Sequence, residues 1–334
     1  MLPPGEIGCI ANGSPQGFEL TPAGAMAIIA FPSAGVFVQE RRFRLPDGID
    51  ALTSDSAEEM KNWMPSQVMQ APKGEMVPKH TVRDQGPYSS RNTSKGSIIA
   101  AASLVFGVLS EGLSIGDVRD LTLKGNLLRQ PSRNTRERIW DALHHRYLTH
   151  RIGWIIDSLA QASRRGTQSQ EFISLLYLHY VLRDHLTYDF VTETLWNKWL
   201  HNSHRVSQQD VLELLDRASS IQVQIKRWTE TSRAKLAGSI LAALRDFGLL
   251  EGAAKKKLVK PDLPLSTAEH MVRLLTAEGL RGRQILEDPI WMIFLCNESD
   301  VNSILAKLAL EHRIRFEKAG NTVVLETPGE WEEP

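Results

Sequence analysis

The sequence predicts a mainly α-helical protein, a helical bundle with helix-turn-helix and winged-helix modules and small β-hairpin wings. Three observations support this fold class. Several segments with apolar residues at helical spacing begin with Ser or Asn followed three residues later by Asp or Glu, as in a capping box. Two of the later helical segments continue into short stretches with the pattern of a β-hairpin. The 334 residues are enough for two or three modest domains.

Residues 1–86 are expected to form a disordered or loosely structured N-terminal extension. Pro, Gly, Ser and Met recur in this stretch, and its hydrophobic periodicity is poor. The alternative is that the true start lies downstream, at Met60, Met64, Met69 or Met76. We expect order to begin near Tyr88.

Residues 87–218 are expected to form a helical domain with a helix-turn-helix-like start. Three short helices separated by tight turns resemble a trihelical unit of that kind, and they cover 98–109, 114–124 and 135–149. The expected N-caps of the second and third helices are Ser114 and Asn134. The segment 168–184 is nearly apolar throughout and should be the central core helix. Other helices are expected at 152–162, at 189–200 and after a capping box formed by Ser207 and Asp210.

Residues 219–265 are expected to form a winged-helix element. A helix over 231–250 precedes the basic stretch EGAAKKKLVKP, which is the expected wing. At 100° per residue, one apolar stripe must face the core, and it contains Leu236, Ile240, Ala243, Leu244 and Phe247. Small and basic residues lie on or beside the opposite side, namely Lys235, Gly238, Ser239, Ala242 and Arg245. Small residues among bases allow a helix to approach a phosphate backbone closely.

Residues 266–334 are expected to form a C-terminal helix-plus-hairpin domain with an acidic tail. A capping box at Ser266 and Glu269 should start a helix that runs to about residue 278. A helix over 300–312 then leads into a hairpin over 313–326, so a second, small winged-helix-like fold is plausible. From Glu326 onward the chain has four acidic residues and no basic one.

Positive charge is concentrated within a chain that is neutral as a whole. Lys and Arg number 39, as do Asp and Glu, so the formal net charge is zero. Between residues 219 and 260, however, nine bases face three acids, which gives a local charge of +6. Such a distribution favours a polyanionic partner for this segment.

The basic residues of this segment are the candidate contacts to double-stranded DNA. Lys and Arg would supply the attraction to phosphates, and the release of condensed counterions would supply much of the free energy. These candidate contacts are Arg233, Lys235, Ser239, Arg245, Lys255, Lys256, Lys257 and Lys260. The competing interpretation is a solvated helix face and a solvated loop. Gln222 and Gln224 are candidates for reading base edges by proximity alone.

The predicted helix 135–149 is a second candidate for DNA contact. Arg133 and Arg138 are its best placed phosphate contacts, while Arg136 and Arg146 are expected on its inner flank. The alternative is that these arginines form ion pairs along the helix, Arg133 with Glu137 and Arg138 with Asp141.

Other classes of protein are disfavoured. Two cysteines cannot build a disulfide framework or a thiolate metal site, and they suit a reducing cytoplasm. No stretch approaches the roughly 20 apolar residues that span a bilayer. His201 and His204 lack the carboxylate partner of a zinc motif, and P-loop, dinucleotide-binding and nucleophile-elbow motifs are absent from the sequence. We therefore expect no catalytic residues, no metal, no cofactor and no membrane partner.

Several segments together resemble a known family. GNLL at 125–128 leads into PSRNTRERIWDALHHRY at 131–147, and the apolar segment 172–182 and the segment 187–200 follow. The most specific part is WTETSRAKL at 228–236, which runs on to the RDFGLL end at 245–250. In this order the segments are similar to the BrxA family of the bacterial BREX bacteriophage-exclusion systems, and the similarity covers roughly Tyr88 to Leu265.

The resemblance implies a mostly helical, DNA-binding protein without enzymatic activity. Such a protein would work beside the methyltransferase and ATPase components of the defence system. The basic surface of the family carries over at Arg233 and Lys235 only. An older label describes members as inner-membrane proteins, and the hydropathy of this chain argues against that label.

Two other functions remain open at this point. In the first, the protein is an assembly adaptor that docks partner proteins through its acidic tail and through Trp196, Trp199, Trp228 and Trp291. In the second, it is a nuclease or other enzyme whose site is invisible in the sequence. The DNA-binding hypothesis requires Lys235, Arg245 and the triple-lysine loop to lie along one exposed ridge.

Overall fold

The computed structural model describes residues 82–90, 95–150, 152–253, 255–320 and 322–328, together with the backbone of three strands near the N-terminus. The chain divides into two compact units, Met1–Glu75 and Met76–Pro334. In the first unit, β1 (Gly8–Ala11) pairs antiparallel with β2 (Phe18–Leu20) and parallel with β3 (Met26–Ile29). The rest of the expected N-terminal extension lies outside the described residues, apart from its last five.

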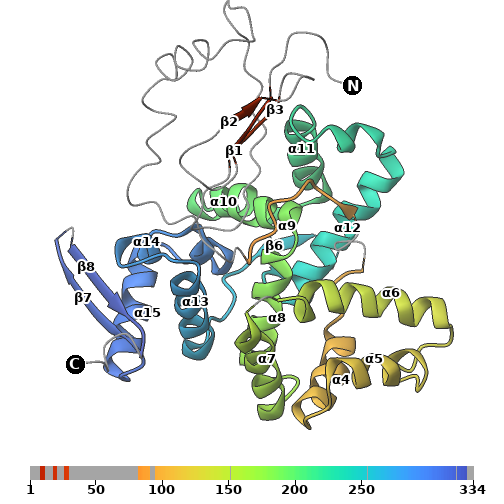
Figure 1. The fold of residues 1–334 in the computed structure, drawn as a ribbon, viewed down its shortest axis with the longest axis horizontal. Helices are drawn as coiled ribbons and strands as arrows, with labels where there is room; N and C mark the ends of the chain where they lie inside the picture. The colour runs from red at the N-terminus through yellow and green to blue at the C-terminus, as the bar shows by residue number, and fades with distance from the viewer. Residues whose placement is uncertain are drawn as a thin grey trace, which may run out of the picture. The chain divides into compact units, whose positions relative to one another are not determined.

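The described part of the second unit is mainly helical, as the sequence predicts (Figure 1). Its first helices are α4 (Ile99–Ser110), α5 (Ile115–Leu123), α6 (Arg133–Leu143), which continues as the π-helical turn η1 (His144–Leu148), and α7 (Gly153–Arg165). Then follow α8 (Gln170–Leu182) and one helical stretch made of α9 (His185–Asp189), η2 (Phe190–Leu195) and α10 (Trp196–Leu200).

The capping signals place some helix starts correctly and misplace others. Ser114 and Ser207 form the capping boxes that the sequence predicts. The prediction of Asn134 as a cap is wrong, because the Ser132 hydroxyl accepts from the Thr135 amide and the helix starts two residues earlier. The predicted box at Ser266 is also wrong, because Pro264 precedes the helix and Leu265 already lies inside it.

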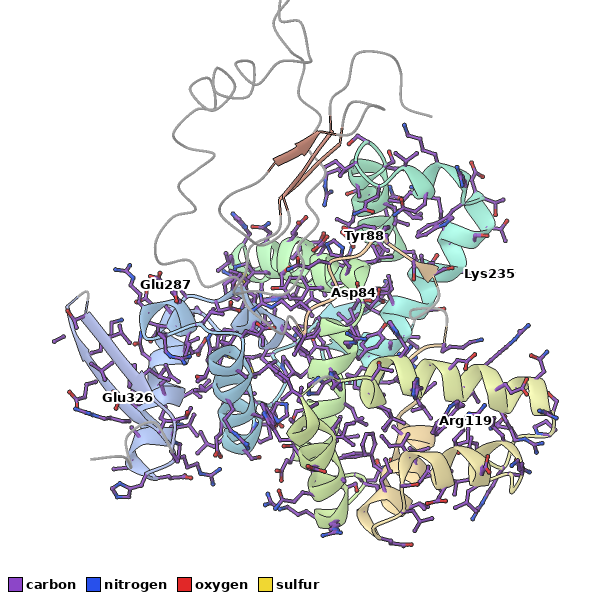
Figure 2. The ribbon with its side chains drawn as sticks, viewed as in Figure 1. Asp84, Tyr88, Arg119, Lys235, Glu287 and Glu326 are labelled. Atoms are coloured by element: carbon purple, nitrogen blue, oxygen red, sulfur yellow. The ribbon has the colours of Figure 1, made fainter. Side chains whose placement is uncertain are left out.

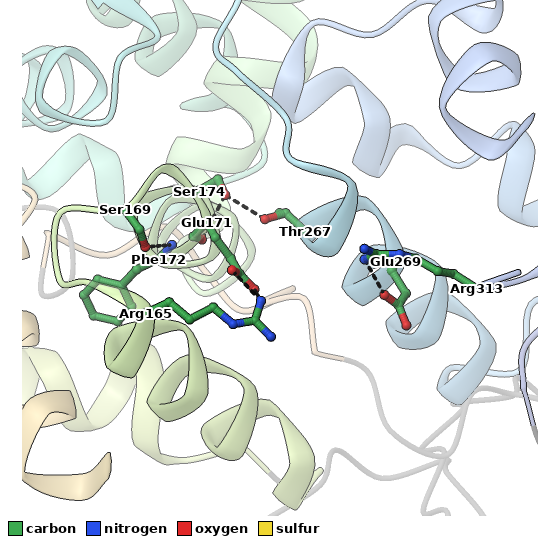
Figure 3. A network of polar contacts seen from close by, with 8 residues as sticks. All are labelled: Arg165, Ser169, Glu171, Phe172, Ser174, Thr267, Glu269 and Arg313. Atoms are coloured by element: carbon green, nitrogen blue, oxygen red, sulfur yellow. Dashed lines mark hydrogen bonds and ion pairs between the residues drawn. The ribbon is translucent and has the colours of Figure 1, made fainter. Parts of the chain in front are cut away.

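The helix α8 is the centre of the core, as predicted. Ten of its residues are buried, and it contacts α7, η1, α9 and α13 (Leu265–Ala277). Its Ser174 hydroxyl lies 2.7 Å from the Thr267 hydroxyl of α13 (Figure 3). The Tyr177 hydroxyl donates to the Ile293 carbonyl over 2.8 Å, so buried polar contacts as well as apolar packing join the C-terminal helices to α8.

A small three-stranded sheet is built from strands that lie on both sides of two α-helices in the sequence. β4 (Arg205–Val206) precedes α11 (Gln208–Ala218), the short η3 (Val223–Arg227) and α12 (Glu230–Asp246), and then β5 (Leu250–Glu251) and β6 (Lys256–Leu258) form a hairpin. Of the two α-helices, only α12 lies inside the predicted winged-helix element 219–265, while α11 and the first strand precede it. The strand order is β4-β6-β5, and both pairings are antiparallel. Gly252 permits the tight hairpin, since its φ is +91° and a Cβ would lie 2.3 Å from the Lys255 carbonyl oxygen.

The C-terminal part repeats the order of helices followed by a hairpin. After α13 come α14 (Arg283–Leu286), η4 (Pro289–Phe294) and α15 (Glu298–Leu310), and β7 (Arg315–Ala319) pairs antiparallel with β8 (Thr322–Glu326). The predicted helix over 300–312 is thus found slightly earlier, behind a capping box of Asn297 and Asp300. Residues 329–334 of the acidic tail lie outside the described residues.

An extended segment, residues 82–90 and 95–98, crosses several of these helices, and we call it the strap. The Val82 amide donates to Glu278 beyond α13, and the Asp84 amide donates to the Leu182 carbonyl at the end of α8. The Tyr88 hydroxyl donates to Asp189, and the Ser97 hydroxyl donates to Asp246 at the end of α12. Val82, six residues before Tyr88, is thus already packed against this unit.

Candidate nucleic-acid interface

The helix α12 buries the predicted stripe and exposes the predicted opposite side. Leu236, Ile240, Ala243, Leu244 and Phe247 are all buried, whereas Lys235 is exposed and Ser239 is half-buried. Thr229 caps the helix by accepting from the Ser232 amide over 3.2 Å. The orientation of α12 was therefore predicted correctly from its periodicity.

Gly238 has a structural role in addition to its small size. A Cβ at this position would lie 3.2 Å from the Gln208 amide nitrogen of α11. The glycine therefore leaves room for the Gln208 side chain of α11. This packing explains the residue without a ligand, so Gly238 gives no support to a close approach of DNA.

Three predicted contacts are exposed and form no ion pair within the described residues. These are Lys235 on α12, Lys255 in the hairpin turn and Lys257 on β6. Figure 2 shows Lys235 on the outer side of its helix. Lys256 is half-buried, and its ammonium donates to the Ala253 carbonyl over 2.7 Å. The positive charges of Lys235, Lys255 and Lys257 are thus not engaged in ion pairs with the described residues.

The sheet adds a cation that the sequence analysis missed. Arg205 on β4 is exposed and lies directly opposite Lys257 on β6. Like charges directly opposite each other across two strands destabilise a sheet. Glu251 on β5 is the other cross-strand neighbour of Lys257 and offsets part of this repulsion. Only the pairing of β4 with β6 brings Arg205 to this surface, and no short sequence pattern signals that pairing.

Other predicted contacts are occupied by carboxylates of the protein. Arg233 pairs with Asp216 and donates to the Leu212 carbonyl, both on α11, so it ties α12 to α11. Lys260 pairs with Asp300 at the start of α15 over 2.7 Å. Arg245 pairs over 2.9 Å with its neighbour Asp246, which also accepts from Ser97 of the strap. The charges of these three bases are compensated internally, so a single ridge of Lys235, Arg245 and the triple-lysine loop stays a prediction.

The two glutamines considered as base readers hold the strap instead. Gln222 accepts from the Tyr88 amide over 3.2 Å, and Gln224 donates to the Tyr88 carbonyl over 3.3 Å. Gln224 also donates to Gln222 over 2.6 Å. Their side chains therefore point toward the protein, and the interpretation as base readers is wrong.

On α6 the structure separates the two candidate arginines. Arg133 pairs with Glu137 over 2.8 Å, as the ion-pair alternative predicts. Arg138 is exposed and forms no such pair with Asp141 in the described structure. Arg146 lies on the inner flank as expected, fully buried, with its guanidinium 4.7 Å from the centre of the Tyr180 ring. Arg138 is therefore the candidate on this helix with an uncompensated charge.

In the C-terminal hairpin, by contrast, the basic side chains form ion pairs with neighbouring carboxylates. Arg315 on β7 pairs with Glu317 and with Glu326 on β8, and Lys318 pairs with Glu298 of α15 over 3.0 Å. Arg313 just before β7 pairs with Glu269 of α13 over 3.2 Å (Figure 3). Figure 2 places Glu326 on this hairpin. Because its bases are compensated by neighbouring carboxylates, this hairpin is a poorer match for a polyanion than the β5–β6 hairpin.

The tryptophans proposed as docking residues belong to the core. Trp291 is buried, and its indole donates to the Ile285 carbonyl over 2.7 Å. Trp196, Trp199 and Trp228 are partly buried and pack against the same core. Their packing explains their presence without a protein partner.

Three histidines cluster where η1 and α8 meet α13: His179 and His270 are buried, and His150 is half-buried. The Nε2 atoms of His179 and His270 lie 2.9 Å apart, and the His150 ring centre is 4.7 Å from that of His179. Burial, followed by repulsion from Arg183, lowers the pKa of His150 to about 4, while burial and Arg273 lower the pKa of His270 to about 3. Burial also lowers the pKa of His179. The cluster is neutral at physiological pH and serves packing.

Residues arranged for other chemistry are scarce in the described ranges. No group of three or more His, Cys, Asp or Glu residues there is arranged to hold a metal ion. Burial raises the pKa of the Cys296 thiol to about 11, which leaves it unreactive at neutral pH. Among the helices that the structure describes, none combines the length and apolar character needed to cross a membrane.

Comparisons with known proteins agree with the similarity noted in the sequence. A crystal structure of an uncharacterized protein from Magnetospirillum magneticum has a similar fold, with a TM-score of 0.50 and 14% sequence identity, over 63% of this chain and 100% of that one. No curated protein matches the chain. The family model named BrxA matches residues 86–274, more than half of the chain. The chain therefore belongs to the BrxA family.

Proposed function

We propose that this protein is a double-stranded-DNA-binding, non-enzymatic component of a BREX-type anti-phage system. Membership of the BrxA family suggests a component of such a system, and it suggests other BREX components as partners. The methyltransferase and the ATPase of the system are the partners that we propose, and the cytoplasm is the proposed location. The binding of DNA is a more specific proposal. It is supported by the order of strands and helices from β4 to β6 and by the exposed basic residues of this element.

The connectivity from β4 to β6 supports the proposal that this element is a winged helix. A short strand is followed by two helices and a hairpin, and the first strand pairs with the last, which gives the order β4-β6-β5. In helix-turn-helix proteins the second of the two helices enters the major groove of DNA. By this analogy α12 would enter the groove, and the β5–β6 hairpin would lie beside it as the wing.

The observation that carries the proposal is the only partly compensated charge of this element. Lys235, Lys255 and Lys257 form no ion pair with any residue that the structure describes, and Lys257 lies between Arg205 and Glu251 on the neighbouring strands. Glu251 offsets only part of the repulsion between Arg205 and Lys257, because like charges directly opposite each other destabilise a sheet. A phosphate backbone would compensate these charges and release counterions on binding. Arg138 on α6 is a further proposed phosphate contact.

Recognition of sequence is expected to be weak. The helix α12 presents the exposed Thr231 and Lys235 and the half-buried Ser239, and it contains no Asn or Gln that could bind a purine in a bidentate manner. Its two arginines, Arg233 and Arg245, pair with Asp216 and Asp246. Contacts to phosphates position a protein without reading the bases. We therefore propose that the binding is mainly to the DNA backbone.

The test is a duplex-binding titration with two variants that change the net charge by the same amount, each by replacing one lysine with glutamate. Lys257→Glu changes an exposed lysine of the proposed wing, and Lys307→Glu changes an exposed lysine on α15 that has no ion pair within the described residues. Lys257→Glu should weaken binding of a labelled duplex severalfold, because one phosphate contact is lost and a repulsion is added. Lys307→Glu should bind like the wild type.

Equal affinity of both variants would contradict the assignment of the interface. A wild-type chain that binds no duplex, but retains partner proteins after nuclease treatment, would instead favour the adaptor function.

A further inference from the structure

The connection between α11 and α12 exposes two aliphatic side chains to water. Ile221 is 82% exposed and Val223 is 58% exposed. Within the described residues, the other exposed large apolar side chains are Leu310 at 80%, Leu200 at 52% and Leu121 at 40%. Ile221 and Val223 are two residues apart, so they form a pair, whereas Leu310 lies alone. We call Ile221 and Val223 the aliphatic pair.

Hydrogen bonds hold this connection in its conformation. The Ile221 and Gln222 amides both donate to the Ala218 carbonyl, over 3.0 and 2.7 Å, so the chain turns sharply after α11. Gln222 and Gln224 bind the backbone of Tyr88 in the strap. Ile225 is buried and anchors the connection on its far side. Gln222, Gln224 and Ile225 are therefore held against the protein, while Ile221 and Val223 are exposed to solvent.

The surroundings of the aliphatic pair are basic and polar. Ser220, Lys226 and Arg227 are exposed in the same connection, and the two bases form no ion pair among the described residues. The nearest acids along the chain are Glu230, which is exposed, and Asp216, which is engaged by Arg233. Two aliphatic side chains within a basic rim are too few for a stable protein interface, which buries about 800 Å² on each partner.

Duplex DNA fits this combination. Its phosphates match Lys226 and Arg227, while its sugars and the methyl groups of thymine offer apolar surface beside the phosphates. The connection also directly precedes the N-terminus of α12, the helix proposed to enter the groove. The aliphatic pair would thus reach the edge of the same groove.

We propose that Ile221 and Val223 make an apolar contact with the sugar and thymine-methyl surface of the DNA groove, beside the phosphate contacts of Lys226 and Arg227. This inference rests on the proposed function, and it assigns to the aliphatic pair the salt-independent part of the affinity. Apolar contacts release no counterions, so their contribution does not vary with the logarithm of salt concentration as phosphate contacts do.

The test compares two substitutions of exposed aliphatic residues by serine. The double variant Ile221→Ser/Val223→Ser removes the aliphatic pair, and Leu310→Ser is the control with matching exposure. Fluorescence anisotropy with a labelled duplex is measured at several salt concentrations. The double variant should bind about tenfold more weakly at every concentration, with the same slope of log affinity against log salt as the wild type. Leu310→Ser should change neither the affinity nor the slope.

The possible failures are distinguishable. If the wild type binds duplex and the double variant binds equally tightly, the aliphatic pair makes no DNA contact and the inference is overturned, while the proposed function stands. A loss that appears only at low salt would also overturn it, since that would be an electrostatic effect. If the wild type binds no duplex at any salt concentration, both proposals fall. An unchanged melting temperature of the double variant confirms that the fold is intact, as expected for exposed residues.

Discussion

The buried histidine cluster makes the stability of this protein depend on pH. His150 and His270 have pKa values of about 4 and about 3 in the folded chain, against the usual 6.5. Unfolding exposes both rings to water. Between the two sets of pKa values, the rings are protonated in the unfolded chain and neutral in the folded chain. The two neutral rings therefore contribute their whole stabilisation above pH 6.5. The free energy of unfolding falls as the pH drops from there toward the pKa values of the folded chain.

The size of the effect follows from these two values. At pH 5 an exposed histidine is almost fully protonated, whereas His150 and His270 remain mostly neutral. The linkage relation then gives a loss of about 2 kcal/mol for each ring between pH 7 and pH 5, or about 4 kcal/mol for the two. Typical domains have only about 5–15 kcal/mol of stability. His179, whose pKa burial also lowers, acts in the same direction.

Urea unfolding at pH 7, 6 and 5 measures this dependence. His150→Gln should make the decline with pH shallower, because one titrating ring is removed. His312→Gln is the control, since His312 is exposed and lies outside the cluster. A wild-type free energy of unfolding that stays constant from pH 7 to pH 5 would refute the reasoning, as would an equal slope in His150→Gln and the wild type.

Two further predictions concern contacts between helices. Arg233→Ala should lower the free energy of unfolding by about 1 kcal/mol, because the Asp216 pair is partly exposed, and it should leave the salt dependence of duplex binding unchanged. If this variant had a smaller slope of log duplex affinity against log salt concentration than the wild type, Arg233 would be a phosphate contact after all. Thr267→Val should cost about 1 kcal/mol in the same unfolding assay, because one buried hydrogen bond to Ser174 is lost while Ser174 still donates to the Glu171 carbonyl. No loss would show that the hydroxyl pair does not stabilise the junction of α8 and α13.

The parts of the fold that were predictable depend on local patterns. The apolar stripe of α12 and the apolar run of α8 follow from the periodicity of burial, so their positions were predicted correctly. Helix starts depend on competing caps a few residues apart, which is why Ser132 replaced the expected Asn134. The strap has no periodicity, and single contacts such as that of Val82 with Glu278 are invisible in the sequence.

The sequence predicted which segment of the candidate interface is basic, but not which of its side chains are free to contact a partner. The sequence locates a basic segment, but it does not show which bases the fold compensates. Asp216 and Asp300 neutralise Arg233 and Lys260 through contacts between separate helices. Arg205 reaches the wing only because β4 pairs with β6, and Gln222 turns inward only because the strap lies beside it. Each of these outcomes is set by tertiary structure.

The most direct test of the central claim is the slope of log duplex affinity against log salt concentration. The wild type is compared with Lys255→Glu/Lys256→Glu/Lys257→Glu, in which the wing has lost its three consecutive lysines. Each lost phosphate contact should reduce the slope by about 0.9, so the variant should bind more weakly and with a slope that is flatter by about 2 to 3, while its fold is unchanged. Equal slopes and affinities for the two proteins would contradict the account, because the wing would then make no contact with the DNA.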